Sequence, residues 1–303
     1  MKVIVLDDGY AGHVEGLEVV RGGALAGDDV AGLLIDVHIP VGEEDFERLP
    51  ALRAIATAST GFDHVDVAAA SARGVWVCNV ADYCTEEVAE TTIGFLLALV
   101  RGIVTHDLNV RAGGWDPRAV PSMRRLRDVR LGVVGFGRIG SAVAARVRAL
   151  GCEVWANDTL VPAEQIAAAG VRPAALDELL RECDAVSLHV PLTGETIGLI
   201  GSRELGLMRP GAVLVNTARG QVVDLEALLE ALRSGRLAGA ALDVLPVEPP
   251  VEPLDAPGLI VTPHAAWYSP AAEGERYARA ADSVRAVLAG GTPDGAVNSP
   301  LAR

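Results

Sequence analysis

Three polar residues in the second half of the chain have side chains suited to acid–base chemistry, and each follows a stretch of apolar residues. Arg219 comes after Ala212–Asn216, and His264 comes after Leu259–Thr262. Glu248 lies in a proline-rich loop that follows another apolar stretch. Ligands of open parallel sheets bind outside the carboxyl ends of the strands, so we expect all three residues at a ligand site.

The chemistry of these side chains fits hydride transfer at a carbon that carries a hydroxyl group. Such a reaction also moves a proton, and histidine is the side chain that exchanges a proton near neutral pH. A carboxylate beside the imidazole orients the ring and stabilises its protonated form. Arginine binds a carboxylate through two parallel hydrogen bonds and polarises a neighbouring carbonyl.

Taken singly, each of the three residues also has an ordinary structural explanation. Arg219 fits a surface arginine or a helix cap, and Glu248 fits a solvated residue among prolines. His264 follows a proline and fits a histidine at the end of a strand. Their joint placement at strand ends is what favours a catalytic interpretation.

Three glycines, Gly135, Gly137 and Gly140, have the G-x-G-x-x-G spacing of a dinucleotide-binding turn. The apolar Leu131–Val134 before them is typical of a buried strand, and the alanine-rich Ser141–Leu150 after them is typical of a helix. This arrangement lets backbone amides and a helix dipole approach a pyrophosphate closely.

Asp158 supplies the second half of this cofactor pattern, since it stands 18 residues after Gly140 at the end of an apolar stretch. A carboxylate at this distance accepts hydrogen bonds from the adenosine ribose and repels the extra phosphate of NADP. The sequence therefore predicts NAD as the cofactor.

The composition excludes several other classes of function. The formal net charge of the 303 residues is −14, with no basic stripe, so we expect no nucleic-acid partner. No apolar run is long enough to cross a bilayer, and the N-terminus has no signal-peptide pattern, so we expect no membrane partner and a cytoplasmic location. The four cysteines have no metal-binding spacing, so we expect no metal and, in general, buried thiols.

Strand-like and helix-like stretches alternate along the chain, which is typical of an α/β protein. In the first hundred residues, Val14–Asp29 carries four glycines and gives no clear helix, whereas Thr85–Val100 predicts a long helix that connects two domains. The other expected strands are Lys2–Leu6, Ala31–Val37, Ala51–Thr57, Val75–Asn79, Glu153–Asn157, Ala185–Val190 and Ala238–Asp243, and the other expected helices begin at Glu43, Val67, Asp177, Asp224 and Ala271.

The segments Asn216–Gly220, Asp243–Pro249 and Thr262–Ala266, behind Gly135–Gly140, resemble the D-isomer-specific 2-hydroxyacid dehydrogenases. The resemblance extends over nearly the whole chain. It implies two doubly wound parallel-sheet domains, with a Rossmann domain for NAD at residues 99–270 inserted into a flavodoxin-like substrate domain at residues 1–98 and 271–303. It also implies an enzyme that interconverts a D-2-hydroxy acid and its 2-keto acid.

The resemblance assigns roles to individual residues. His264 is the acid–base group, Glu248 its partner, and Arg219 holds the carboxylate and carbonyl of the substrate. Backbone amides at Ser59, Thr60 and Gly61 receive the substrate carboxylate, and Trp267 borders the substrate. The residues implied at the cofactor are Cys84, Gly135, Gly137, Arg138, Ile139, Gly140, Asp158, Val190, Pro191, Thr196, Thr217, Ala218, Asp243, His264 and Ala266.

Residues 81–90 and 264–269 are similar to the family branch that includes the C-terminal-binding proteins. An NAD-sensing corepressor-like scaffold with little turnover is therefore the alternative to an enzyme, although the chain has no basic run and a short first domain. By this similarity, Cys84 stands where a small residue contacts the cofactor, and the alternative is a buried thiol. Trp267 stands where a tryptophan lines the pocket, and the alternative is ordinary packing at the hinge. Formate oxidation fits less well, because relatives that carry it out lack the glutamate present here as Glu248.

Two departures from the family leave the substrate open: the turn at residues 57–61 and the short first domain. Relatives carry larger or basic residues where Thr57 and Ala58 stand, and a glycine where Ser59 stands. His38 ends a strand and faces either the same cleft or solvent, as a plain loop histidine does.

Relatives also pair through the region of Arg101–Met123, which holds Leu108, Val110 and Trp115 here, so the resemblance implies a homodimer.

Overall fold

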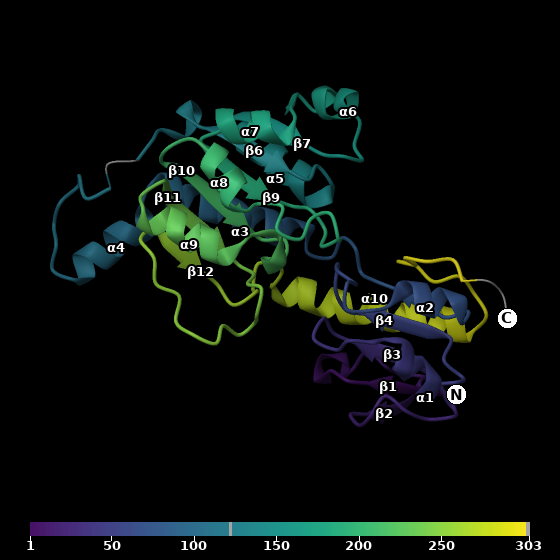
Figure 1. The fold of residues 1–303 in the computed structure, drawn as a ribbon. Helices are drawn as coiled ribbons and strands as arrows, with labels where there is room; N and C mark the ends of the chain where they lie inside the picture. The colour runs from purple at the N-terminus through teal and green to yellow at the C-terminus, as the bar shows by residue number, and fades with distance from the viewer. Residues whose placement is uncertain (121–122, 301–303) are drawn as a thin grey trace. The chain divides into compact units, whose positions relative to one another are not determined.

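The computed structural model describes residues 1–120 and 123–300, and the chain divides into two compact units (Figure 1). The first unit contains Met1–Tyr83 and Tyr268–Arg303, and the second is the continuous segment Cys84–Trp267. The expected substrate domain includes residues 301–303, and the expected dimer segment includes residues 121–122; these positions lie outside the described residues.

The second unit is built on a parallel sheet, in which seven strands are found among the described residues in the order β12-β11-β10-β9-β6-β7-β8. The chain leaves β6 (Arg130–Val134) toward one edge and returns at β9 (Ala185–Leu188) toward the other. A ligand crevice forms where the strand order reverses in this way. The other strands are β7 (Glu153–Asn157), β8 (Arg172–Pro173), β10 (Ala212–Asn216), β11 (Leu237–Leu242) and β12 (Leu259–Val261).

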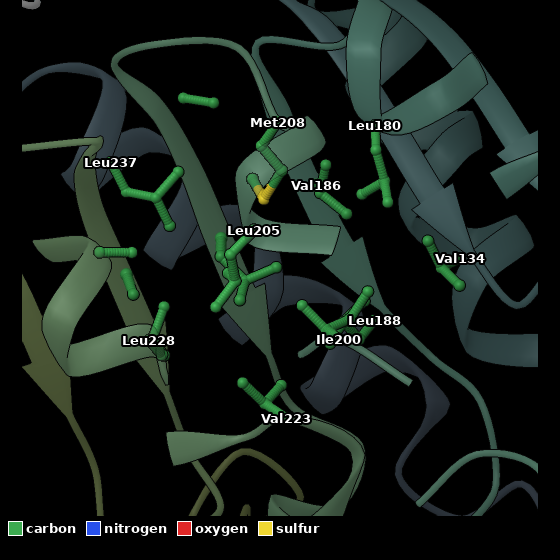
Figure 2. Packing of buried hydrophobic residues seen from close by; sticks show 14 of the residues in the cluster. Val134, Leu180, Val186, Leu188, Ile200, Leu205, Met208, Val223, Leu228 and Leu237 are labelled. Atoms are coloured by element: carbon green, nitrogen blue, oxygen red, sulfur yellow. The ribbon is translucent and has the colours of Figure 1, made fainter. Parts of the chain in front are cut away.

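Alternate residues of each strand build two separate cores, because successive side chains of a strand point to opposite faces. On one face, Val134, Val186 and Leu214 pack with the helices α7, α8 and α9. Figure 2 shows this core, with Leu205 of α8 and Met208, directly after that helix, among the strand residues. The helix bounds are α7 (Leu176–Glu182), α8 (Ser202–Leu207) and α9 (Leu225–Arg233).

On the opposite face, Val133 and Val213 pack with α3 (Thr85–Val100) and α5 (Arg138–Ala149). The short helix α6 (Ala163–Ala168) contributes Ile166 to this core. Both faces of the sheet are therefore covered, as a buried parallel sheet requires.

Helix α3 belongs to the second unit, whereas the bounds expected from the sequence place residues 84–98 with the first domain. The physical reason is the packing of its apolar face, which lies against α5, β10 and β11. Leu96 and Val100 are buried in the same core as the strand residues of β6. The division between the units thus falls at residues 83/84 and 267/268.

The first unit has a parallel sheet of five strands among its described residues, in the order β2-β1-β3-β4-β5. One face packs with α1 (Glu43–Arg48) and α2 (Val67–Ala72), and α10 (Pro270–Leu288) lies against β3, β4 and β5. The two parallel sheets confirm the α/β class predicted from the alternating pattern. The strands are β1 (Lys2–Val5), β2 (Glu18–Arg21), β3 (Val30–Ile35), β4 (Ala54–Thr57) and β5 (Trp76–Cys78).

The connection between β1 and β2 contains a single 3₁₀ turn, η1 (Asp8–Tyr10), and no α-helix. The glycine-rich segment Val14–Asp29, which gives no clear helix in the sequence, contains the strand β2. Arg285 of α10 ties this connection down by donating hydrogen bonds to the carbonyls of His13 and Glu15.

In the described part of the chain no single helix is both long and apolar enough to cross a membrane. Only α3 and α4 (Ile103–Arg111), taken together across a 60° bend, reach that length and composition.

Candidate active site

His264 and Glu248, predicted as a pair, lie side by side in the second unit. The imidazole Nδ1 is 2.8 Å from Oε2 of Glu248, and the other carboxylate oxygen accepts a hydrogen bond of 2.8 Å from the amide of Leu245. Both side chains are more than a quarter exposed. The carboxylate is thus fixed by its own loop and in turn orients the imidazole, the arrangement that an acid–base histidine needs.

The backbone of His264 is in the left-handed region, with φ at +53°, a conformation that is uncommon for residues other than glycine. Asp243 holds it there. The amides of Ala265 and Ala266 each donate to its carboxylate at 2.9 Å, and the hydroxyl of Thr262 donates to it as well. The backbone amide of His264 donates to the carbonyl of Asp243 at 2.8 Å. Asp243, which the resemblance places at the cofactor, therefore stabilises the loop that carries His264.

Arg219 follows β10 on a loop braced by Asn216. The side-chain amide of Asn216 donates to the Arg219 carbonyl at 2.9 Å, and its oxygen accepts from the Ala218 amide at 3.0 Å. Gly220 then lets the loop approach the backbone of Leu245, where an added Cβ would lie 1.9 Å from the carbonyl carbon. Through this close approach the arginine loop packs against the loop that carries Glu248.

The three glycines of the dinucleotide motif have three different environments. Gly135 has φ at +90°, and a Cβ there would lie 2.6 Å from the carbonyl oxygen of His189. A Cβ on Gly140 would lie 2.0 Å from the carbonyl oxygen of Gly135, so this glycine allows α5 to pack against the turn. Gly137 is exposed, and a Cβ there would meet no atom within 4 Å. Open backbone at Gly137 is what the approach of a pyrophosphate requires.

Asp158 follows β7 and turns its carboxylate toward the same turn. Its oxygens accept hydrogen bonds from the amides of Phe136 at 2.6 Å, Leu160 at 2.7 Å and Val161 at 2.9 Å. Partial burial raises the pKa of Asp158, but these amides outweigh that effect and hold the pKa below its usual value. The group is therefore an anion at neutral pH, positioned beside the glycine turn.

The other residues expected at the cofactor lie on loops and helix ends of the second unit. Thr196 closes the loop after β9 by donating to the Pro191 carbonyl at 2.6 Å. His189, just before this loop, has its pKa lowered to about 4 by burial. Val190 and Ala218 are half-buried, Thr217 and Ala266 are buried, Arg138 and Ile139 begin α5, and Cys84 is buried directly before α3.

The turn expected to bind a substrate carboxylate lies in the first unit, after β4. Its carbonyls are tied to the unit itself: Val80 N–H donates to the Ser59 carbonyl at 2.9 Å, and the Asn79 side chain to the Thr60 carbonyl at 2.6 Å. Ser59 Oγ donates to the Gly61 carbonyl at 2.6 Å. In a planar trans peptide the N–H points opposite to the carbonyl, so these anchors direct the amides of Thr60 and Gly61 away from Asn79 and Val80.

The remaining candidates are placed as follows. Trp267 is half-buried at the end of the second unit, and His38 is exposed on its loop in the first. Burial raises the pKa of Cys78 and Cys183 to about 12 and that of Cys152 to about 11, consistent with inert thiols. Within residues 1–120 and 123–300, no three His, Cys, Asp or Glu side chains gather as ligands of a metal ion would.

Sequence reasoning missed the residues that support these loops. Asn216 was visible as an asparagine ending a buried strand, a signal for a side chain that caps its own turn. Thr262 and Asn79 had no such signal, since their partners lie on loops 19 residues away in the sequence.

The glycine environments predict opposite results for two alanine variants. Gly140→Ala should lower the free energy of unfolding by about 1–3 kcal/mol, because the added methyl group collides with backbone. Gly137→Ala should keep the wild-type melting temperature and weaken NADH binding by about tenfold, since its methyl group occupies open space in the turn. Thermal unfolding and fluorescence titration with NADH measure both effects. Wild-type NADH affinity in Gly137→Ala would refute the role of this glycine.

Comparison with known proteins agrees with this geometry. Residues 93–266 match the family described as D-isomer specific 2-hydroxyacid dehydrogenase, NAD binding domain. The chain is 39% identical to a glyoxylate reductase of Korarchaeum cryptofilum, over 91% of this chain and 84% of that protein. It is 38% identical to a glycerate dehydrogenase of Methylorubrum extorquens, over 83% of this chain and 81% of that protein.

Solved structures show the same fold. A D-lactate dehydrogenase from Aquifex aeolicus, complexed with NAD and lactic acid, has a TM-score of 0.87 at 29% identity and covers 96% of both chains. An NADPH-dependent glyoxylate/hydroxypyruvate reductase from Sinorhizobium meliloti, in complex with NADP and malonate, also has a TM-score of 0.87 at 29% identity. That match covers 100% of this chain and 98% of the other.

The sequence relatives correct one expectation: they include a glyoxylate reductase and a glycerate dehydrogenase, and they do not support the branch of the C-terminal-binding proteins. The similarity of residues 81–90 and 264–269 to that branch is too short to outweigh matches over most of the chain. By its sequence and its fold, the chain belongs to the D-isomer-specific 2-hydroxyacid dehydrogenase family, NAD(P)-dependent enzymes that interconvert 2-keto acids and D-2-hydroxy acids.

Proposed function

We propose that this enzyme reduces a small 2-keto acid of the size of glyoxylate or hydroxypyruvate with NADH. The observation that carries the chemistry is the 2.8 Å contact between His264 and Glu248, which supplies an oriented acid–base group. The relatives named above as glyoxylate reductases and as a glycerate dehydrogenase support a substrate of two or three carbons.

Each proposed site residue has a distinct task in this reaction. When bound in the turn at Gly135, Gly137 and Gly140, NADH would supply a hydride to the substrate. His264, engaged with Glu248 through Nδ1, donates a proton from Nε2 to the carbonyl oxygen. The guanidinium of Arg219 polarises the carbonyl and pairs with the carboxylate. In the reverse direction the neutral imidazole accepts the proton of the hydroxyl group.

The turn at Ser59, Thr60 and Gly61 is our proposed site for the substrate carboxylate in the first unit. Its anchored carbonyls leave a row of amides with a common direction, and such amides attract anions.

A panel of 2-keto acids assayed with NADH tests the activity, and two variants test the pair. His264→Ala should lower kcat by about a hundredfold to ten-thousandfold, the usual value of a positioned acid–base group. Glu248→Gln should lower kcat by about tenfold or more, because the charge that stabilises the imidazolium is lost. NADH affinity should be unchanged in Glu248→Gln. Glu248→Gln with wild-type kcat would show that this glutamate is only part of its loop.

The cofactor preference is a separate prediction. Since Asp158 is held as an anion by three backbone amides, kcat/KM for NADH should exceed that for NADPH by about tenfold or more. Asp158→Asn keeps a hydrogen-bond acceptor and removes the charge, so it should reduce this ratio mainly by improving the use of NADPH. Steady-state kinetics with both cofactors measure the ratio. Equal efficiency in the wild type would contradict the proposal.

We further propose a homodimer formed through helix α4 and the segment that follows it. Figure 1 shows α4 projecting from the sheet of its unit, and none of its residues is buried. Leu108 is 61% exposed and Trp115 is 88% exposed. Exposed apolar residues that cluster in this way mark protein interfaces, and pairing of identical subunits about a two-fold axis is the commonest assembly.

Light scattering tests the dimer. The wild type should have twice the monomer mass of 31.5 kDa at micromolar concentration, and Trp115→Glu should shift it toward the monomer. Val251→Glu is the matched control, since Val251 is also 88% exposed but lies outside this segment. A wild-type particle of 31.5 kDa would refute the proposal.

The four free cysteines, all buried, support a reducing and hence cytoplasmic compartment for this enzyme.

A further inference from the structure

Arg276 of helix α10 is a buried cation that the proposed mechanism does not use. The residue is 5% exposed, and its Nη1 donates hydrogen bonds of 2.9 Å to Oδ2 of Asp36 and of 2.9 Å to the carbonyl of Ala58. Its Nη2 donates to the hydroxyl of Tyr277 at 2.6 Å, and that hydroxyl donates to Asp7 at 2.9 Å. All of these residues belong to the first unit.

A buried ion pair is a poor way to gain stability alone, because removing both charges from water offsets most of their attraction. An apolar side chain would pack α10 against the sheet at lower cost, as the buried Val284 does beside Gly32 of β3. The planar guanidinium does what an apolar residue cannot: it holds two acceptors from different strand ends in one fixed geometry. Asp36 directly follows β3, and Ala58 directly follows β4.

The hydrogen bond to the Ala58 carbonyl fixes the orientation of the peptide that joins Ala58 to Ser59. The N–H of Ala58 donates to the Ile35 carbonyl at 3.1 Å, which continues the ladder between β3 and β4. Its carbonyl is held by Arg276, and the N–H of Ser59 lies in the same peptide plane and points the opposite way. Arg276 thus sets the direction of the first amide in the turn, where Val80 and Asn79 set those of the next two.

We infer that Arg276 is a positioning residue for substrate binding: held by Asp36, it fixes the peptide of Ala58 and Ser59 so that the turn presents its amides to the substrate carboxylate. This inference rests on the proposed function, since that proposal assigns the turn to the substrate. Arg276 acts through the turn and touches neither substrate nor cofactor in this scheme.

The test compares Arg276→Lys and Arg276→Met with the wild type. Lysine keeps the charge but has one nitrogen, so it cannot hold Asp36, the Ala58 carbonyl and the Tyr277 hydroxyl in the plane that Nη1 and Nη2 define. In both variants, peptides covering residues 57–62 should exchange their amide hydrogens faster. The KM for glyoxylate at saturating NADH should rise by about tenfold or more, as expected for the loss of a hydrogen bond from a charged donor. The dissociation constant of NADH should be unchanged.

Arg285→Met is the matched control on the same helix. Its guanidinium also donates to backbone carbonyls, those of His13 and Glu15, but it makes no contact with the turn. This variant should lower the melting temperature and leave both the KM and the exchange of residues 57–62 unchanged. Should Arg276→Met fail to fold, Arg276→Lys and Asp36→Asn provide the same comparison, with a smaller effect expected for Asp36→Asn.

Unchanged exchange of residues 57–62 in a folded Arg276→Lys variant would overturn the inference, whatever the KM. Faster exchange with a wild-type KM would overturn the link to the substrate and leave the enzyme activity standing. A wild-type protein that reduced no 2-keto acid would refute the proposed function and with it the substrate role; the exchange data would still show whether Arg276 holds the turn.

Discussion

The buried carboxylate of Asp243 fixes the loop on which the chemistry of the second unit depends. Donors on both sides of His264 converge on it, from Thr262, Ala265 and Ala266, and the residue is only 2% exposed. A carboxylate buried this deeply must keep its hydrogen bonds. If the loop relaxed from its left-handed conformation, the carboxylate would become exposed or would lose its hydrogen-bond donors. Asp243 thus fixes the backbone of His264, and Glu248 fixes the orientation of its ring.

The same principle recurs at the other strand ends, where a buried polar side chain next to a functional loop holds that loop. Asn216 braces the segment of Arg219, and Asn79 and Arg276 brace the turn of the first unit. Because the strands are parallel, these loops lie at one edge of each sheet. The side-chain hydrogen bonds then reduce the conformational freedom that an exposed loop would otherwise have. The side chains of His264 and Glu248 are exposed enough to meet a ligand. The side chains that hold the loops are buried, namely Asp243, Asn216, Asn79 and Arg276.

Most strands and the long helices could be predicted from the sequence, because buried parallel strands are uninterrupted apolar runs and amphipathic helices have their own period. The residues at strand ends could be predicted for the same reason, and His264 and Glu248 do meet. Short elements such as α6, α8 and the two-residue β8 lack a period that can be recognised. The contacts between distant segments could not be predicted, since Arg276 and Asp36 are 240 positions apart and only the folded sheet brings them together. The placement of α3 depended on which core receives its apolar face, and a helix pattern alone does not specify that.

The discontinuity of the first unit has a consequence for how the chain is made. Its sheet is complete by Cys78, but the helix that lies against β3, β4 and β5 is α10, and the segment that bridges Cys78 begins only near Ala296. During synthesis at the usual rates, about ten to forty seconds separate the emergence of these two halves. The second unit is continuous and can fold within that interval, whereas the first 83 residues wait with an apolar sheet face uncovered. On the ribosome, the N-terminal part of this enzyme is therefore the last to reach its native state, and during that interval it is the part most exposed to chaperones and aggregation.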